Sequence, residues 1–440
     1  MRAAVTAGSI GKWPRGVAGL CALALLCLWP LRSWAQVGFF HVENQDGIWW
    51  LVNPQGQPTL SIGVDHISYR GDATQGGGPA PYFAAVQKQY PTEMAWDLGA
   101  LARLERWGFN TVGAWSDPSL WNYHVPYVMI LGIAAHAGAN WQKGKPVDVF
   151  APVFPQVARQ LADQAGIPRT GDHNLIGYFS DNELRWGADW RGRKSMLMLY
   201  LAMPLSAPGH QHAADFLRQR YHDNLRALAR AWGIRRPKDF DYLRQAGRTA
   251  AYQSDAAAFL AQVAARYFQV CASAIHQADP NHLYLGARFS LPVPDAVLAA
   301  ARIADVVSVN IYARDPRPIV RHIYRLTGKP ILVTEFAFRA QDSGLPNTRG
   351  AGPKVPNQAA RGAAYRQFVT DLESQPEAIG YHWFEWADEP AQGRFDGENS
   401  NYGLVNIRDQ PYQQFVAAVR AANLAAAGVH AHSEPPETER

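Results

Sequence analysis

Eight short apolar segments recur along the chain, and amphipathic helical patterns separate most of them. These segments are residues 59–67, 110–115, 127–133, 174–179, 283–289, 306–312, 331–336 and 379–386. Apolar strands that alternate with helices build a parallel sheet whose outer face is covered by helices. Eight such units predict an α/β protein with a closed (β/α)8 barrel, the TIM barrel. An open doubly wound sheet is the alternative, but Gly63-Val64-Asp65-His66 does not supply the glycine-rich phosphate turn typical of that fold.

Three segments fall outside this alternation and define the expected domain limits. Residues 36–58 hold two aromatic-rich runs separated by turn residues, which predicts an N-terminal β-hairpin that covers the barrel. Residues 184–254 interrupt the pattern after the fourth strand and predict a helical insertion. Residues 428–440 include Ser-Glu-Pro-Pro-Glu and predict a disordered tail. The catalytic barrel is therefore expected over residues 59–427.

The first 35 residues predict a signal peptide. A basic start is followed by an apolar run over residues 17–28 and by Ser33-Trp34-Ala35, which has the small residues that signal peptidase requires. An uncleaved anchor is the alternative, but the run is shorter than the ~20 residues of a spanning helix. Cleavage near Ala35 predicts a secreted or periplasmic bacterial protein. Cys271 is then the only cysteine left, which excludes an intrachain disulfide.

Charge argues against polyanionic partners. The formal net charge is +5, but the predicted leader carries four basic residues and no acidic one. The remainder is nearly neutral, so neither nucleic acid nor a membrane surface is an expected partner. The acid-rich segments Asp388-Glu389 and Asp396-Gly397-Glu398-Asn399 miss the spacing of a calcium loop, so we expect solvated surface there, with no metal and no cofactor.

Two glutamates stand where predicted strands end. Asn182-Glu183 follows the fourth strand, and Glu335 ends the seventh. These strands lie across the barrel from each other, and chemistry in such barrels collects at the carboxyl ends of strands. Two facing carboxyl groups, one donating a proton and one attacking carbon, suit glycoside cleavage, and a separation of ~5 Å gives retention. The alternatives are ion pairs with Arg185 and Arg339.

Further polar and aromatic residues are expected at the same rim as substrate-binding groups. Trp383 and Trp386 are three positions apart, so an extended strand cannot point both to one side, and we expect one to form a sugar platform. Barrel packing is the alternative for Trp115 and Tyr312, and Trp186 and Trp190 are candidates for a cleft wall. The predicted binding set is Asn182, Tyr312, His66, Arg288, Trp115, Trp383 and Trp386.

At these residues the sequence resembles the clan A retaining glycosidases and, more closely, the β-agarases of glycoside hydrolase family 50. The closer resemblance rests on Asp46–Val52, Ser61–His66, Gly177–Glu183, Tyr402–Asn406 and Asp409–Tyr412. It implies Glu183 as acid/base and Glu335 as nucleophile. It also implies that Asn182 holds the sugar 2-hydroxyl and that Tyr312 orients Glu335. The implied substrate is a β-linked oligo- or polysaccharide, an agarase-like β-galactan first.

The resemblance leaves alternatives open. Family members typically carry a long region ahead of the barrel, where this sequence has only residues 36–57. Other β-galactans, β-glucans or the cell's own exopolysaccharide therefore remain candidate substrates. A catalytically silent glycan-binding barrel and a transglycosylase, both in exopolysaccharide metabolism, are the alternative functions. Neither the oligomeric state nor the choice between internal and terminal attack follows from the sequence.

Overall fold

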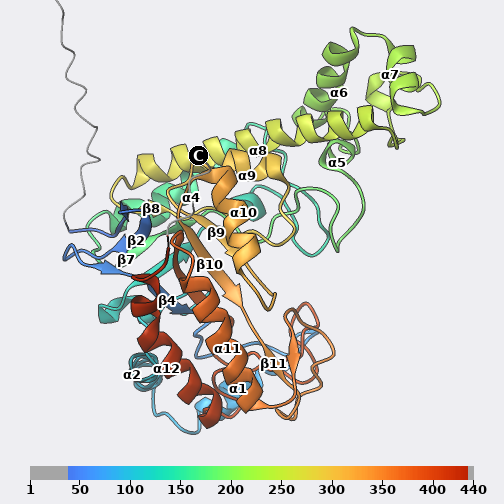
Figure 1. The fold of residues 1–440 in the computed structure, drawn as a ribbon. Helices are drawn as coiled ribbons and strands as arrows, with labels where there is room; N and C mark the ends of the chain where they lie inside the picture. Colours follow the sequence, from blue (N-terminus) through green and yellow to red (C-terminus); the bar gives the residue numbers. More distant parts are fainter. Residues whose placement is uncertain (1–37, 435–440) are drawn as a thin grey trace, which may run out of the picture. The chain divides into compact units, whose positions relative to one another are not determined.

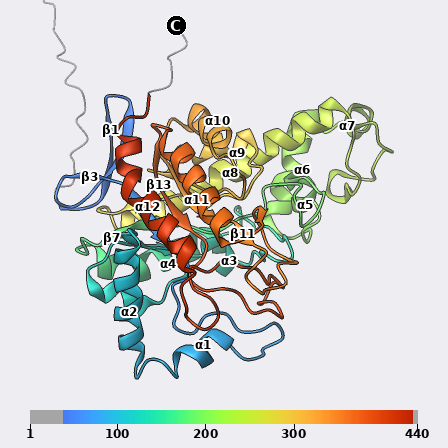
Figure 2. The ribbon, with the colours of Figure 1, turned by 60° about the horizontal axis from the view of Figure 1, so that its bottom comes forward.

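A computed structural model of the chain describes residues 38–434. The predicted signal peptide therefore lies outside the described residues. The described segment belongs to one compact unit, and Figures 1 and 2 show it from two directions.

A curled sheet of eight parallel strands forms the centre of the fold (Figure 1). Its order is β8-β7-β6-β5-β4-β13-β10-β9, so the first predicted strand pairs with the second and with the last. A parallel bridge between Phe289 and Val309 joins the two remaining edges, beyond β8 and within β9. The sheet is thus a TIM-like barrel. Its strands are β4 (Ser61–Val64), β5 (Thr111–Val112), β6 (Tyr127–Ile130), β7 (Leu175–Phe179), β8 (Leu283–Tyr284), β9 (Val307–Asn310), β10 (Ile331–Phe336) and β13 (Ala378–Trp383).

Helices cover the outside of the barrel, and local sequence signals set their ends. Thr92 caps α2 by accepting the N–H of Ala95, and Asn357 caps α11 by accepting that of Ala360. Gly328 ends α10 in the left-handed conformation (φ 62°), which glycine adopts without strain. The covering helices are α2 (Glu93–Arg106), α4 (Val153–Gly166), α8 (Ala250–Ala278), α9 (Asp295–Ala301), α10 (Arg317–Thr327), α11 (Gln358–Glu373) and α12 (Gln413–His430).

A small antiparallel sheet precedes the barrel. Strands β1 (His41–Gln45) and β2 (Ile48–Val52) pair around Asp46-Gly47, and β3 (Pro58–Thr59) adds a third strand beside β2. Both turn residues have positive φ, as a two-residue hairpin turn requires. Phe40 and Leu51 pack in the same cluster as barrel residues such as Ile176 and Leu332. The small sheet therefore contributes to one end of the barrel core.

A helical arm lies between β7 and β8. It contains α5 (Met196–Tyr200), α6 (Pro208–Tyr221) and α7 (Leu225–Trp232), and it joins the barrel through α8. In Figures 1 and 2, α6 and α7 stand away from the sheet at the far end of α8. With 29 residues, α8 is about 44 Å long. It is long and apolar enough to span a membrane, but 61% of its most apolar window is buried inside the protein, which is typical of a core helix.

The end of the chain differs from the prediction. Residues 428–430 belong to α12, and the His430 side chain is wholly buried, with Nε2 2.8 Å from the carbonyl oxygen of Trp49. The predicted start of a disordered tail at residue 428 is therefore wrong. The apolar spacing that would have extended the helix is weak there, because Ala425 to Gly428 are small residues that fit either state.

Candidate active site

Glu183 and Glu335 lie at the carboxyl ends of barrel strands, as predicted. Glu335 is the fifth residue of β10 and is 4% exposed. Glu183 follows β7 in a left-handed backbone conformation (φ 47°), and its N–H donates to the carbonyl of Arg288 at 3.0 Å. The charge of Arg288 lowers the pKa of both carboxyl groups, and the charge of Glu183 raises the pKa of Glu335. The two groups therefore face one shared site.

Two donors hold the carboxylate of Glu335. Arg288 Nη2 donates to Oε1 at 2.8 Å, and the Tyr312 hydroxyl donates to Oε2 at 2.7 Å. The same Arg288 nitrogen is 2.5 Å from Asp65 Oδ2 and 2.9 Å from the carbonyl oxygen of Thr334. Charge-assisted bonds of this kind fix geometry as well as charge. Arg288 is wholly buried, so it positions Glu335, and the prediction that it contacts substrate is corrected.

Asn310 connects the two glutamates. Its Nδ2 donates to Glu183 Oε1 at 3.0 Å and to Asn182 Oδ1 at 3.2 Å. Its Oδ1 accepts the Thr334 hydroxyl at 2.8 Å, which fixes the orientation of the amide. Asn182 thus keeps its own amide N–H groups available at the mouth. The sequence places Asn310 at a strand end, but the pattern gives no sign of this bridging position.

Burial and hydrogen bonding shape the protonation of the pair. Burial raises the pKa of Glu335 to about 8; Arg288 and Tyr312 oppose this shift, while Glu183 and Asp65 add to it. Burial likewise raises the pKa of Glu183, against the effects of Asn310 and Arg288. Two such neighbours retain a proton near neutral pH. Glu335 accepts from a charged guanidinium and a hydroxyl, whereas Glu183 accepts only from neutral groups, the amide of Asn310 and the indole of Trp141, so the proton belongs on Glu183.

Aromatic and charged groups surround the pair. Trp115 is 39% exposed, and its ring centroid lies 4.2 Å from the guanidinium carbon of Arg288. The ring centroid of Phe384 lies 6.4 Å from the ring centroid of Trp115. His66 Nδ1 is 2.6 Å from Glu385 Oε2. Burial lowers the pKa of His66, but Asp72 and Glu385 outweigh it and raise the pKa to about 9. Sequence reasoning missed Phe384 and Glu385, because both follow a strand whose path beyond Trp383 cannot be read from its pattern.

Known proteins resemble this chain in sequence and in fold. No family model matches the chain. β-Agarase B of Vibrio sp. (strain JT0107) is 27% identical over 88% of this chain and 48% of its own length. β-Agarase A of the same strain is 28% identical over 91% and 47%. A solved structure of an exo-β-agarase shares the fold, with a TM-score of 0.80 and 24% identity over 90% of this chain and 66% of that one.

The chain therefore resembles β-agarases in sequence and in fold. It spans about half the length of the curated relatives it matches.

Two of the predicted binding residues lie away from the site. Trp383 and Trp386 are wholly buried. Trp383 donates its indole N–H to the carbonyl of Tyr402 at 2.9 Å and packs among the rings of Phe336, Tyr365 and Phe415. Trp386 donates to the Tyr82 hydroxyl at 2.9 Å and packs on Trp96 and Trp107. Neither can reach a sugar, and their assignment as substrate-binding residues is wrong.

The acid-rich segments are buried or half-buried, so the prediction of solvated surface is wrong. Asp388 and Glu389 are buried, and Arg394 is the centre of the cluster, 3.0 Å from Glu389 and 2.8 Å from Glu398. His66, Asp72 and Glu385 have donor atoms within 4.8 Å of one another, an arrangement that suits a metal ion. Arg394 lies 3.9 Å from Asp72 and 3.8 Å from Glu385, however, so a side chain already supplies the positive charge.

Proposed function

We propose that this protein is a retaining glycoside hydrolase that cleaves a β-linked polysaccharide, with an agarase-like β-galactan as its substrate. The observation that carries the proposal is the pair Glu183 and Glu335 at the barrel mouth, joined through Asn310, Thr334 and Arg288. The curated β-agarases that the chain resembles support the same substrate class.

In the first step Glu335 attacks the anomeric carbon of the sugar while Glu183 transfers its proton to the glycosidic oxygen. The C–O bond to the leaving group breaks, the leaving sugar departs as an alcohol, and an ester joins Glu335 to the glycosyl unit. Arg288 and Tyr312 hold the two oxygens of Glu335, so one lone pair points at the substrate. Asn182, fixed through Asn310, is the donor or acceptor for the sugar 2-hydroxyl.

In the second step Glu183, now a carboxylate, removes a proton from water. The resulting nucleophile attacks the anomeric carbon, the ester to Glu335 breaks, and the sugar leaves with its original configuration. No step requires a metal or a cofactor. The partly exposed Trp115 and His66 lie at the mouth and are proposed to contact the bound sugar.

The proposed molecule is a (β/α)8 barrel with residues 36–58 as a hairpin cover and residues 184–254 as a helical insertion. It is proposed to act outside the cytoplasm after cleavage of residues 1–35, where a polymeric substrate is accessible. A polysaccharide is too large to be imported intact, so the proposed substrate and the proposed location depend on each other.

Reducing-end release from a panel of polysaccharides tests this proposal. Agarose, porphyran, other β-galactans, β-glucans and the producing cell's exopolysaccharide are incubated with the wild type, Glu183→Gln and Glu335→Gln. We expect the wild type to release sugar from one of them and each variant to lose at least 1,000-fold of that activity (about 4 kcal/mol). Unchanged thermal unfolding shows that the variants fold. Full activity in either variant would refute the assignment.

A further inference from the structure

Two tryptophans stand on the loops beside Glu183. Trp141 follows β6 and Trp190 follows β7, and their ring centroids lie 5.4 Å apart at 64°. Trp190 is 66% exposed; among the described residues only Trp115 is another exposed tryptophan. An exposed indole of this size loses the burial that stabilises most tryptophans, and it offers a flat apolar face with a polar edge.

Arg191 holds this pair rigidly and ties it to Glu183. Its guanidinium carbon lies 5.1 Å from the ring centroid of Trp190 and 5.9 Å from that of Trp141. Asp189 Oδ2 lies 2.9 Å from Arg191 Nε and 2.7 Å from Arg191 Nη2. Arg191 Nη1 donates to the carbonyl of Trp141 at 3.3 Å and to that of Glu183 at 2.9 Å. One side chain thus sets the position of both rings relative to Glu183.

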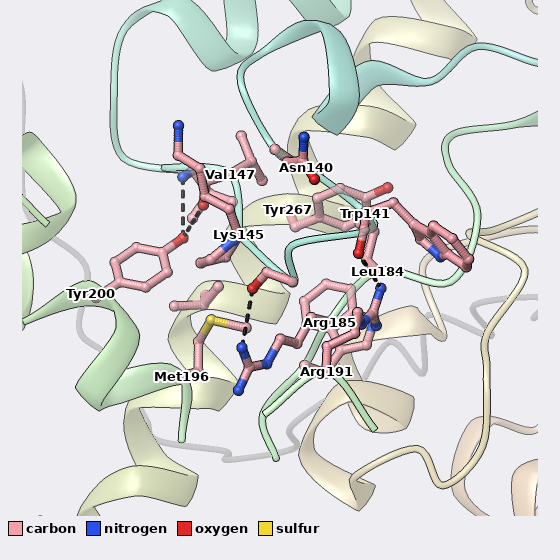
Figure 3. Close-up of a pocket in the computed structure, with 16 residues that line it drawn as sticks. Asn140, Trp141, Lys145, Val147, Leu184, Arg185, Arg191, Met196, Tyr200 and Tyr267 are labelled. Atoms are coloured by element: carbon pink, nitrogen blue, oxygen red, sulfur yellow. Dashed lines mark hydrogen bonds between the residues drawn. The ribbon is translucent and has the colours of Figure 1, made fainter. Parts of the chain in front are cut away.

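A second arginine, Arg185, binds backbone carbonyls of the loops that carry Trp141 and Trp190. Arg185 donates to the carbonyls of Gly144 at 3.2 Å, Gly187 at 2.7 Å and Lys194 at 3.3 Å. Figure 3 shows Arg185 and Arg191 side by side in the cavity under Trp141, each with a dashed bond to the neighbouring loop. The tryptophan pair therefore rests on a preformed support, and binding a ligand there would cost little ordering entropy.

We propose that Trp190 and Trp141 form the subsite for the leaving-group sugar, the pyranose on the far side of the bond to be cleaved. This inference rests on the proposed function. The proton of Glu183 must reach the glycosidic oxygen, and that oxygen departs with the leaving sugar. The leaving sugar must therefore lie on the Glu183 side of the mouth, where Arg191 fixes the two rings.

The chemistry of the subsite selects a neutral sugar with an apolar face. Asp189 pairs with Arg191, so this guanidinium is not free to hold a sulfate or carboxylate group of a ligand. A pyranose that presents one face of C–H groups stacks that face on indole. The subsite also gives an acceptor sugar a place to bind, which favours transfer to a sugar hydroxyl at high product concentration.

The test compares substrates with and without a leaving-group sugar. We measure kcat/KM on the active polysaccharide and on the fluoride of the same glycosyl unit, whose leaving group is a single atom. Trp190→Ala is compared with the wild type and with Tyr242→Ala, which removes a 57% exposed aromatic ring on the arm. We expect Trp190→Ala to lower the ratio of polysaccharide to fluoride kcat/KM about tenfold, and Tyr242→Ala to leave it unchanged.

An unchanged ratio in Trp190→Ala would overturn the inference, as would an equal fall on both substrates. The proposed function fails separately, if the wild type releases sugar from no polysaccharide. In that case calorimetric titration of the same three proteins with galactan oligosaccharides decides the inference. Weaker binding by Trp190→Ala alone supports a sugar platform, and equal binding by all three proteins refutes it.

Discussion

The hydrogen bond from Tyr312 to Glu335 gives a prediction whose size can be derived from the structure. The hydroxyl donates to Glu335 Oε2 at 2.7 Å in a partly buried site. It stabilises the charged carboxylate and so lowers the pKa of Glu335. A hydrogen bond to a charged group contributes ~1.5–3 kcal/mol, and 1.36 kcal/mol corresponds to one pKa unit. Tyr312→Phe should therefore raise the pKa of Glu335 by about one unit or more.

The assay is the pH dependence of kcat/KM, which reports groups of the free enzyme. In the proposed mechanism activity requires ionised Glu335, so activity is lost as pH falls through the pKa of Glu335. Tyr312→Phe should move this acidic limb to higher pH by about one unit and lower kcat/KM about tenfold on that limb. The basic limb, where Glu183 loses its proton, should move much less.

The control is Tyr324→Phe, which removes a tyrosine hydroxyl on α10. That hydroxyl accepts the indole N–H of Trp49 at 3.2 Å. It should leave both limbs in place. An acidic limb that stays fixed in Tyr312→Phe, with the fold intact, would refute the argument that this hydrogen bond holds Glu335 in its charged form.

Two further predictions separate structural from functional residues. Trp386→Ala should lower the free energy of unfolding by ~3–5 kcal/mol, because it removes a buried indole, while KM changes less than twofold in protein that remains folded. Thermal unfolding measures the loss of stability and steady-state kinetics measure KM. A large change in KM would show that Trp386 binds substrate after all. The raised pKa of His66 means that its pairing with Glu385 stabilises the fold fully below pH ~6.5, and this stabilisation is lost as pH rises through about 9. His66→Gln should therefore flatten the pH dependence of the unfolding midpoint in that window, and equal slopes in both proteins would contradict it.

Strand ends could be predicted from sequence, and with them Glu183 and Glu335. Each follows a run of apolar residues, and a carboxylate directly after such a run has few reasons to be there except chemistry. The support around them could not be predicted. Arg288 and Asp65 lie 223 positions apart and meet only because the barrel closes. Nothing local to either residue indicates that contact.

The error at Trp383 and Trp386 has a physical cause. β13 ends at Trp383, and the chain then leaves the regular alternation of the strand. Trp383 donates its N–H to the carbonyl of Tyr402 and Trp386 donates to the hydroxyl of Tyr82, so both indoles lie away from the mouth, and Phe384 takes the place facing Trp115. A rule based on a period of two fails wherever pairing with a neighbour stops, which is also where active sites form.

The continuity of α8 determines where the helical arm lies relative to the barrel. Residues 250–278 contain neither glycine nor proline, so the helix has no point at which it bends easily. The helix leads into β8, so its last residues lie where strands begin and its first residues, which carry the arm, lie where strands end. The arm is therefore carried by an unbroken helix, at the end of the barrel where Glu183 and Glu335 lie.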